Sequence, residues 1–105
     1  MSTSNLQSRR IDVEDSFDAI QDYYDEQGWT DGLPVVPATE ELVRRMLAGC
    51  EGAPNDSLGI IQPRNARVTL EKIAINAVMA GCRPEYFPVV VAAVALAVAA
   101  AAAAA

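Results

Sequence analysis

Residues 70–88 are LEKIAINAVMAGCRPEYFP, and this stretch decides the predicted fold. Its first part predicts a helix over residues 70–80. Thr69 is the expected N-cap, and Gly81 is the residue that ends the helix. A helix that is apolar nearly all round is typical of a buried central element, and the apolar side chains here are Leu70, Ile73, Ala74, Ala77 and Val78, flanked by Ile75 and Met79. Asn76 would then be a buried amide that needs hydrogen-bond partners.

A corner with several functional groups follows this helix. Pro84 suits the first position of a helical turn, so Cys82 and Arg83 are expected beside a helix N-terminus. Such a position favours a thiolate, which makes Cys82 a candidate nucleophile or redox thiol with Arg83 as its electrostatic partner. Glu85 or Tyr86 would handle a proton or orient a substrate. The alternative is that Cys82 is a small buried hydrophobic residue, since the chain has no histidine to act as its base.

Two further helices are predicted earlier in the chain. The first spans residues 14–27 and ends at Gly28, and its apolar stripe consists of Val13, Phe17, Ile20 and Tyr24. The second spans residues 40–48, with Thr39 as its N-cap and Gly49 at its end. Acidic residues in the first turn of each helix suit the helix dipole.

Residues 29–37, WTDGLPVVP, join these two helices. Pro34 and Pro37 fix their own φ angles and favour extended geometry in the residues before them. The pattern predicts a stiff, apolar segment that lies along a sheet edge or another subunit. It is either a structural connector or a pocket wall in which Trp29 and Asp31 contact a ligand.

The region between the second and third helices predicts a loop, a short strand and a basic turn. Turn-forming residues fill 51–57, and residues 58–61 are the expected strand. The basic turn covers residues 62–67, and it lacks the glycine pattern of a nucleotide-binding loop. Arg64 and Arg67 could bind a carboxylate together, or they could pair with the acidic first helix.

Charge and composition narrow the function classes. The net charge of −6 argues against a nucleic-acid ligand. Two cysteines and no histidine predict neither a disulfide framework nor a metal site, and nothing indicates a particular cofactor. Ala-Gly-Cys occurs at 48–50 and at 80–82, so two helix ends could form a reversible thiol pair, or the repeat is a coincidence. The polar N-terminus lacks a signal-peptide pattern, which predicts a cytoplasmic protein.

The predicted fold is mainly α, with three to four helices and short extended segments. Residues 1–12 are polar and predict an arm that is disordered or becomes ordered on a partner. Residues 13–88 predict the helical domain, and residues 89–105 predict a low-complexity Ala/Val helix. Domains of this size are marginally stable. We therefore expect a partner surface, either other protein subunits in a homo- or hetero-oligomer or more of the same chain.

Two motifs carry a resemblance to a known family. DGLPVVP at 31–37 and EKIAINAVMAGCRPEYFPVV at 71–90 resemble a poorly characterised bacterial family. Its members are often encoded beside, or fused to, UGSC-like proteins, which are named for a (seleno)cysteine-Gly-Ser-Cys motif. The resemblance implies that this chain is the N-terminal part of a larger α+β protein. It also implies a helix with ordinary polar residues at 89–105, where alanine would stand for side chains that were not identified. A true alanine-rich helix or a membrane span are the alternatives, and the membrane span is the less expected because alanine anchors weakly.

Two functions fit these observations. The first is an N-terminal region or subunit of a larger cytoplasmic bacterial enzyme assembly, with thiol-dependent chemistry near Cys82 and a substrate or partner bound by Trp29, Asp31, Asn76, Arg64 and Arg67. The second is a non-catalytic docking or accessory subunit. It would bind partner chains through the acidic first helix and the proline-stiffened segment.

Overall fold

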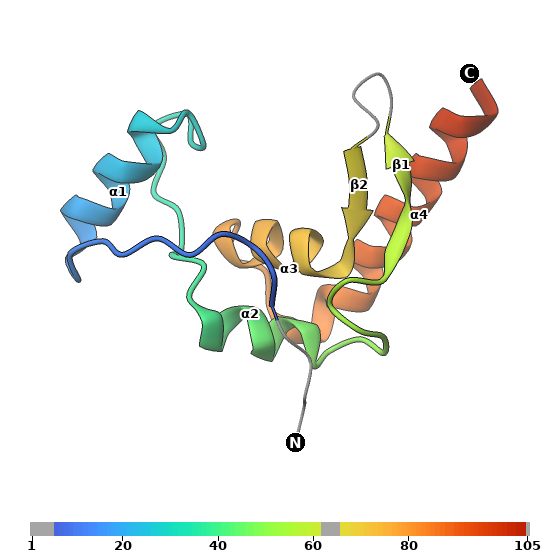
Figure 1. The fold of residues 1–105 in the computed structure, drawn as a ribbon, viewed down its shortest axis with the longest axis horizontal. Coiled ribbons are helices and arrows are strands. Elements are labelled where there is room, and N and C mark those ends of the chain that lie inside the picture. Colours follow the sequence, from blue (N-terminus) through green and yellow to red (C-terminus); the bar gives the residue numbers. More distant parts are fainter. Residues whose placement is uncertain (1–5, 62–65, 105) are drawn as a thin grey trace.

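The structure is a computed structural model, and it describes residues 6–61 and 66–104 (Figure 1). Four α-helices, one 3₁₀ turn and a two-stranded antiparallel sheet make up these residues, in the order α1 (Phe17–Glu26), α2 (Glu40–Leu47), β1 (Ser57–Ile61), β2 (Ala66–Thr69), α3 (Leu70–Met79), η1 (Pro84–Tyr86) and α4 (Phe87–Ala104). The predicted mainly α fold with short extended segments is confirmed.

Helix α3 is the centre of the core, as its apolar pattern predicts. Thr69 caps it by accepting a hydrogen bond from the Lys72 N–H, at 3.3 Å. The apolar residues of α3 pack against α2 and against the start of α4, and the buried cluster contains Val43, Met46, Ile73, Ala74, Ala77, Val78 and Phe87. Met46 and Phe87 are the largest fully buried side chains. Each contributes about 1.5–3 kcal/mol of transfer free energy.

The end of α3 sets the position of Cys82. Gly81 has a φ of 82°, in the left-handed region that glycine adopts without strain. Its N–H donates to the Val78 carbonyl, and the Cys82 N–H donates to the Ala77 carbonyl, both at 2.9 Å. This pair of bonds is a Schellman motif. Pro84 then occupies the first position of η1, as predicted.

Gly49 brings the end of α2 against η1. A Cβ atom at this position would lie 2.3 Å from the Pro84 carbonyl oxygen, so no side chain fits there. The neighbour it would meet is backbone, which cannot move away by changing a rotamer. The glycine that was predicted to end the second helix therefore also allows the contact that holds the Cys82 corner against α2.

The β1–β2 hairpin packs on one side of α4. Ile60 pairs with Arg67 in the antiparallel register, so Arg67 lies in a strand and not in the predicted turn. Turn-forming residues precede it, and the strand is only 4 residues long, so the sequence pattern did not indicate a strand here. Gly59 has a φ of 143°, and a Cβ atom there would lie 2.6 Å from Val98 Cγ1. This close approach places β1 directly on α4, which Figure 1 shows beside the hairpin.

Helix α4 is buried on one side only. Phe87 and Val98 are buried, and Val91 and Val94 pack partly against the core. The stretch 84–101 is the one part of the described chain that is long and apolar enough to cross a membrane by length and composition, with a mean hydropathy of 1.8. Core helices of soluble proteins meet the same criterion, but only 11% of this stretch is buried. Helix α4 therefore presents a long apolar surface outside the core.

Helix α1 differs from its prediction in two ways. It begins at Phe17 instead of residue 14, because the Ser16 hydroxyl accepts a hydrogen bond from the Ala19 N–H, at 3.1 Å, and caps it there. None of its residues is buried, and Phe17 is 62% exposed. The predicted apolar stripe is thus not covered by the core, and Figure 1 shows α1 set apart from the other helices.

The close contact at Gly49 gives a test of this packing. We expect Gly49→Ala to lower the free energy of unfolding by about 2 kcal/mol, because the added methyl group must push η1 away from α2. Urea unfolding followed by far-UV circular dichroism measures this change. Glu51→Ala, in the exposed turn that follows, is the control and should change stability by less than about 0.5 kcal/mol. Equal stability of the two variants would contradict the contact.

Candidate functional site

Four of the predicted site residues line two separate hollows of the structure. A cleft of about 660 Å³ lies between the N-terminal arm, α1, the start of α2 and α3, and Trp29 lines it. A groove of about 560 Å³ lies between β2, α3 and α4, and Cys82, Asn76 and Arg67 line it. Arg64 falls outside the described residues. The remaining predicted residues, Asp31, Arg83, Glu85 and Tyr86, line neither hollow.

The groove contains the thiol, but not the partners predicted for it. Cys82 is partly buried, and its thiol donates a hydrogen bond to the Arg83 carbonyl, at 3.4 Å. The side chains of Arg83, Glu85 and Tyr86 lie on the exposed outside of the corner, and Tyr86 is 57% exposed. The helical turn that begins at Pro84 carries these side chains away from the groove. Proton handling by Glu85 or Tyr86 at Cys82 thus finds no support in this geometry.

Asn76 lies at the rim of the groove and not in the core. Its side chain is exposed, and its amide donates to the Lys72 carbonyl one turn earlier, at 2.8 Å. Such a bond to the preceding turn satisfies the amide locally. The prediction of a buried amide is wrong because α3 has one exposed strip, which the nearly continuous apolar sequence concealed. Lys72 lies on the same strip and also lines the groove.

Two cationic residues, Lys72 and Arg67, line the groove beside its apolar floor. The Lys72 ammonium donates to the Arg67 carbonyl, at 3.4 Å, and the Arg67 guanidinium donates to the Asn55 carbonyl, at 2.8 Å. Within residues 6–61 and 66–104, neither cation forms a salt bridge with a carboxylate. The floor consists of Val68, Ile73, Ala77, Val90 and Val94. The groove can hold an anionic group near a thiol, with an apolar body beneath it.

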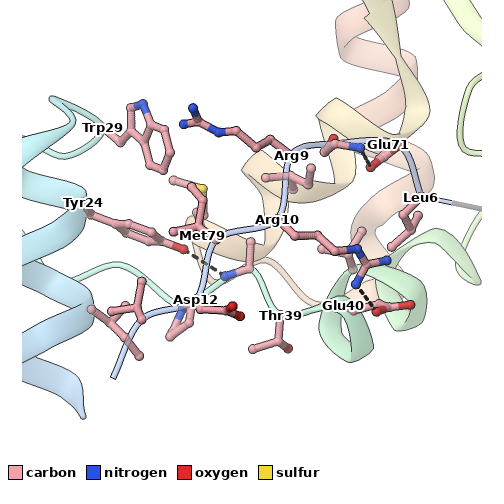
Figure 2. Close-up of a pocket in the computed structure, with 18 of the residues that line it drawn as sticks. Leu6, Arg9, Arg10, Asp12, Tyr24, Trp29, Thr39, Glu40, Glu71 and Met79 are labelled. Carbon is pink, nitrogen blue, oxygen red and sulfur yellow. Dashed lines mark hydrogen bonds and ion pairs between the residues drawn. The ribbon is translucent and has the colours of Figure 1, made fainter. Parts of the chain in front are cut away.

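The cleft is crossed by the arm, which a buried carboxylate anchors (Figure 2). Glu71 is only 4% exposed. Its two oxygens accept the backbone N–H groups of Gln7, at 3.0 Å, and Ser8, at 2.9 Å. Burial raises the pKa of Glu71, but the hydrogen bonds from Gln7 and Ser8 outweigh it and hold that pKa below its ordinary value. Residues 6–12, the described part of the predicted arm, thus contact α3 of their own chain.

A second contact holds the arm at the start of α2. Arg10 forms an ion pair with Glu40, and Figure 2 shows the two side chains meeting. The Glu40 carboxylate also accepts a hydrogen bond from the Arg44 guanidinium, at 2.8 Å. Hydrogen bonds from Arg10 and Arg44 lower the pKa of Glu40 to about 2. Arg10 and Glu40 are exposed to solvent and Arg44 is partly exposed, so these ion pairs contribute little to stability.

Aromatic side chains form one wall of the cleft. The Trp29 ring meets the rings of Tyr23 and Tyr24 at centroid distances of 5.8 and 5.6 Å. The Tyr24 hydroxyl accepts a hydrogen bond from the Ala38 N–H, at 3.1 Å. This bond connects α1 to the segment before α2. Asp31 uses its carboxylate locally, since it accepts the N–H two residues on, at 3.1 Å. It forms a turn and does not join Trp29 in the cleft.

The proline-stiffened segment packs through isolated contacts and pairs with no strand in the described chain. The Val36 N–H donates to the Met79 carbonyl, at 3.1 Å, and the Val35 N–H donates to the Gln21 side chain, at 3.2 Å. Leu33 is 67% exposed. Across residues 6–61 and 66–104, no cluster of three or more Cys, Asp or Glu residues is placed to hold a metal ion.

The Glu71 anchor predicts how the arm responds to pH. Its lowered pKa means that the contact stabilises the arm above the unfolded-state value of about 4.3, and that this contribution is lost as the pH falls through the lower folded value. We expect the amides of Gln7 and Ser8 to be protected from hydrogen exchange at neutral pH and unprotected in acid. Glu71→Gln should remove most of this protection at neutral pH, because a neutral amide accepts more weakly.

Amide exchange measured by NMR checks this prediction. Glu41→Gln is the matched control, because Glu41 is an exposed carboxylate that pairs with Arg45 on α2, away from the arm. It should leave the exchange of both arm amides unchanged. Protection that persists at full strength in Glu71→Gln would show that other contacts hold the arm.

No protein-family model, characterised protein or solved structure shows a significant match to this chain. The family resemblance of residues 31–37 and 71–90 therefore stays a prediction. We infer a function from the contacts, exposure and charges of the described residues.

Proposed function

We propose that this chain is the N-terminal region or a subunit of a larger cytoplasmic bacterial enzyme assembly, in which another chain or a further segment covers α4. The observation that carries the proposal is the outer side of this helix. Val89 is 70% exposed and Leu96 is 73% exposed. They lie two turns apart and therefore on the same side of α4.

The chemistry of α4 supports an apolar partner for this side. A helix that faces water on one side normally carries polar or charged residues there. Helix α4 carries no charged residue on either side. Contiguous exposed apolar surface of this kind usually marks a protein interface or a membrane contact. The packing of the opposite side against the core and the hairpin favours a protein partner.

A substitution on the outer side of α4 tests the proposal. We expect Leu96→Glu to weaken the assembly by on the order of 100-fold or more, because a carboxylate would be buried without a partner. The fold of the chain should survive, since the side chain is already exposed. The measurement is the mass of the native protein by light scattering after size-exclusion chromatography, together with its circular dichroism spectrum.

Leu33→Glu is the matched control, because Leu33 is similarly exposed but lies in the proline-stiffened segment. It should leave the assembly intact. If Leu33→Glu dissociates the assembly and Leu96→Glu does not, the docking alternative through the proline-stiffened segment is correct. A wild-type protein that remains a single chain at every concentration would contradict a partner chain on either surface and would leave a further segment of the same chain as the cover of α4.

A second proposed function is thiol-dependent chemistry on an anionic substrate in the groove. The supporting observation is that Cys82 shares this groove with Lys72 and Arg67. The cations would attract the anionic group, and the thiol would be the reactive atom. Because these 105 residues include no histidine, the base would come from a partner or from a further segment.

Alkylation with a neutral and an anionic reagent tests the groove. We expect iodoacetate to react with Cys82 faster, relative to iodoacetamide, than it reacts with Cys50, which does not line the groove. Lys72→Gln should lower that ratio at Cys82 by about threefold, the size of one lost exposed charge interaction. Mass spectrometry of the modified peptides measures both sites. A ratio at Cys82 that Lys72→Gln leaves unchanged contradicts the role of the cation.

A further inference from the structure

The cleft beneath the arm has the size and lining of a ligand site. Its volume of about 660 Å³ lies within the range of about 300–1,000 Å³ that is typical of small-molecule pockets. Its apolar lining comes from four separate parts of the chain and includes Ile11, Val13, Ile20, Trp29, Val43, Ile75 and Met79. The arm passes over this space and does not fill it.

Several charged groups at the edge of the cleft already have partners. The Glu71 carboxylate accepts two backbone N–H groups from the arm. Glu40 is paired with Arg10 and with Arg44. A ligand would therefore not need to supply a charge to satisfy Glu71 or Glu40. Arg9, Asp12 and Asp15 also line the cleft, at the exposed arm side, and the rest of the surface left for contact is mostly apolar and aromatic. A ligand that is polar throughout would lose its hydration over this apolar surface without gaining matching hydrogen bonds there.

We propose that this cleft binds a neutral, largely aromatic small molecule between α1, α3 and the arm. The rings of Trp29 and Tyr24 form the wall against which an aromatic ligand packs, and Figure 2 shows Met79 beside them. Offset and edge-to-face contacts with these rings add to the free energy of apolar burial. The arm closes over the ligand through the Glu71 and Arg10 contacts.

The arm is held by two contacts, at Glu71 and at Arg10, and these suit a segment that closes over a bound ligand. Apart from them, residues 9–15, which are the end of the arm and the residues that follow it, are largely exposed. A segment with few buried contacts opens at low free-energy cost, so it can admit a ligand without unfolding the core. Helix α1, which forms another wall, buries no residue of its own.

Trp29 provides a direct reporter for the test, because it is the single tryptophan of these 105 residues. The probe is N-phenyl-1-naphthylamine, a neutral aromatic dye that accepts excitation energy from tryptophan. We expect saturable quenching of Trp29 emission as the dye binds. Ile20→Glu, which places a carboxylate in the wall of the cleft, should weaken binding at least tenfold. Glu71→Gln should weaken it several-fold by loosening the arm.

Phe17→Glu is the matched control, since Phe17 lies on the same helix, is exposed and does not line the cleft. It should change the dye affinity by less than twofold. If Ile20→Glu does not fold, Val13→Phe replaces it, because a larger side chain just after the arm fills the cleft and should reduce binding. Dye that binds without quenching Trp29, or that responds equally to Phe17→Glu and Ile20→Glu, overturns the proposal. Such results would place the dye on the exposed side of α4 or on the outside of α1.

Discussion

Burial of α3 is the constraint on which the rest of the structure depends. Helix α2 packs on one side of it, α4 on another, β2 leads directly into it, and the arm is tied to its first turn through Glu71. Its residues include one with no exposed surface, Ala74. Small side chains at such positions let neighbouring helices approach closely, and any larger one would have to displace them. The positions of both hollows follow from this packing.

The ends of α2 and α3 set the direction of the segments that follow them. Gly81 turns the backbone so that Cys82 returns against the core, and Gly49 lets the end of α2 rest on the carbonyl of Pro84. These are local requirements with long-range consequences, because each fixes the direction in which the next element leaves. Helix α1 lacks such a contact with the core, and none of its residues is buried.

The sequence was a sufficient guide wherever local chemistry decides the structure. The caps at Thr39 and Thr69 and the glycine stops were predictable because each depends on a few neighbouring residues. What could not be predicted depends on contacts distant in sequence. The burial of Glu71 needs the arm more than sixty residues earlier, and the strand containing Arg67 is defined only by its pairing with β1. The prediction that Asn76 is buried failed for a related reason. The periodicity of a nearly apolar helix does not show which of its sides lacks a neighbour.

A shift of one residue along α3 separates the two hollows. Glu71, Ile75 and Met79 line the cleft, whereas Lys72, Asn76 and Ala80 line the groove. Spacing of four residues keeps each set on one side of a helix, and a step of one residue turns by about 100°. The acidic and the basic residue at the start of α3 therefore serve different surfaces although they are adjacent in the chain. Since both surfaces share one rigid helix, a side chain can be exchanged in either set without rebuilding the other. Movement of the arm, in contrast, can reach the groove through α3, to which Glu71 ties it.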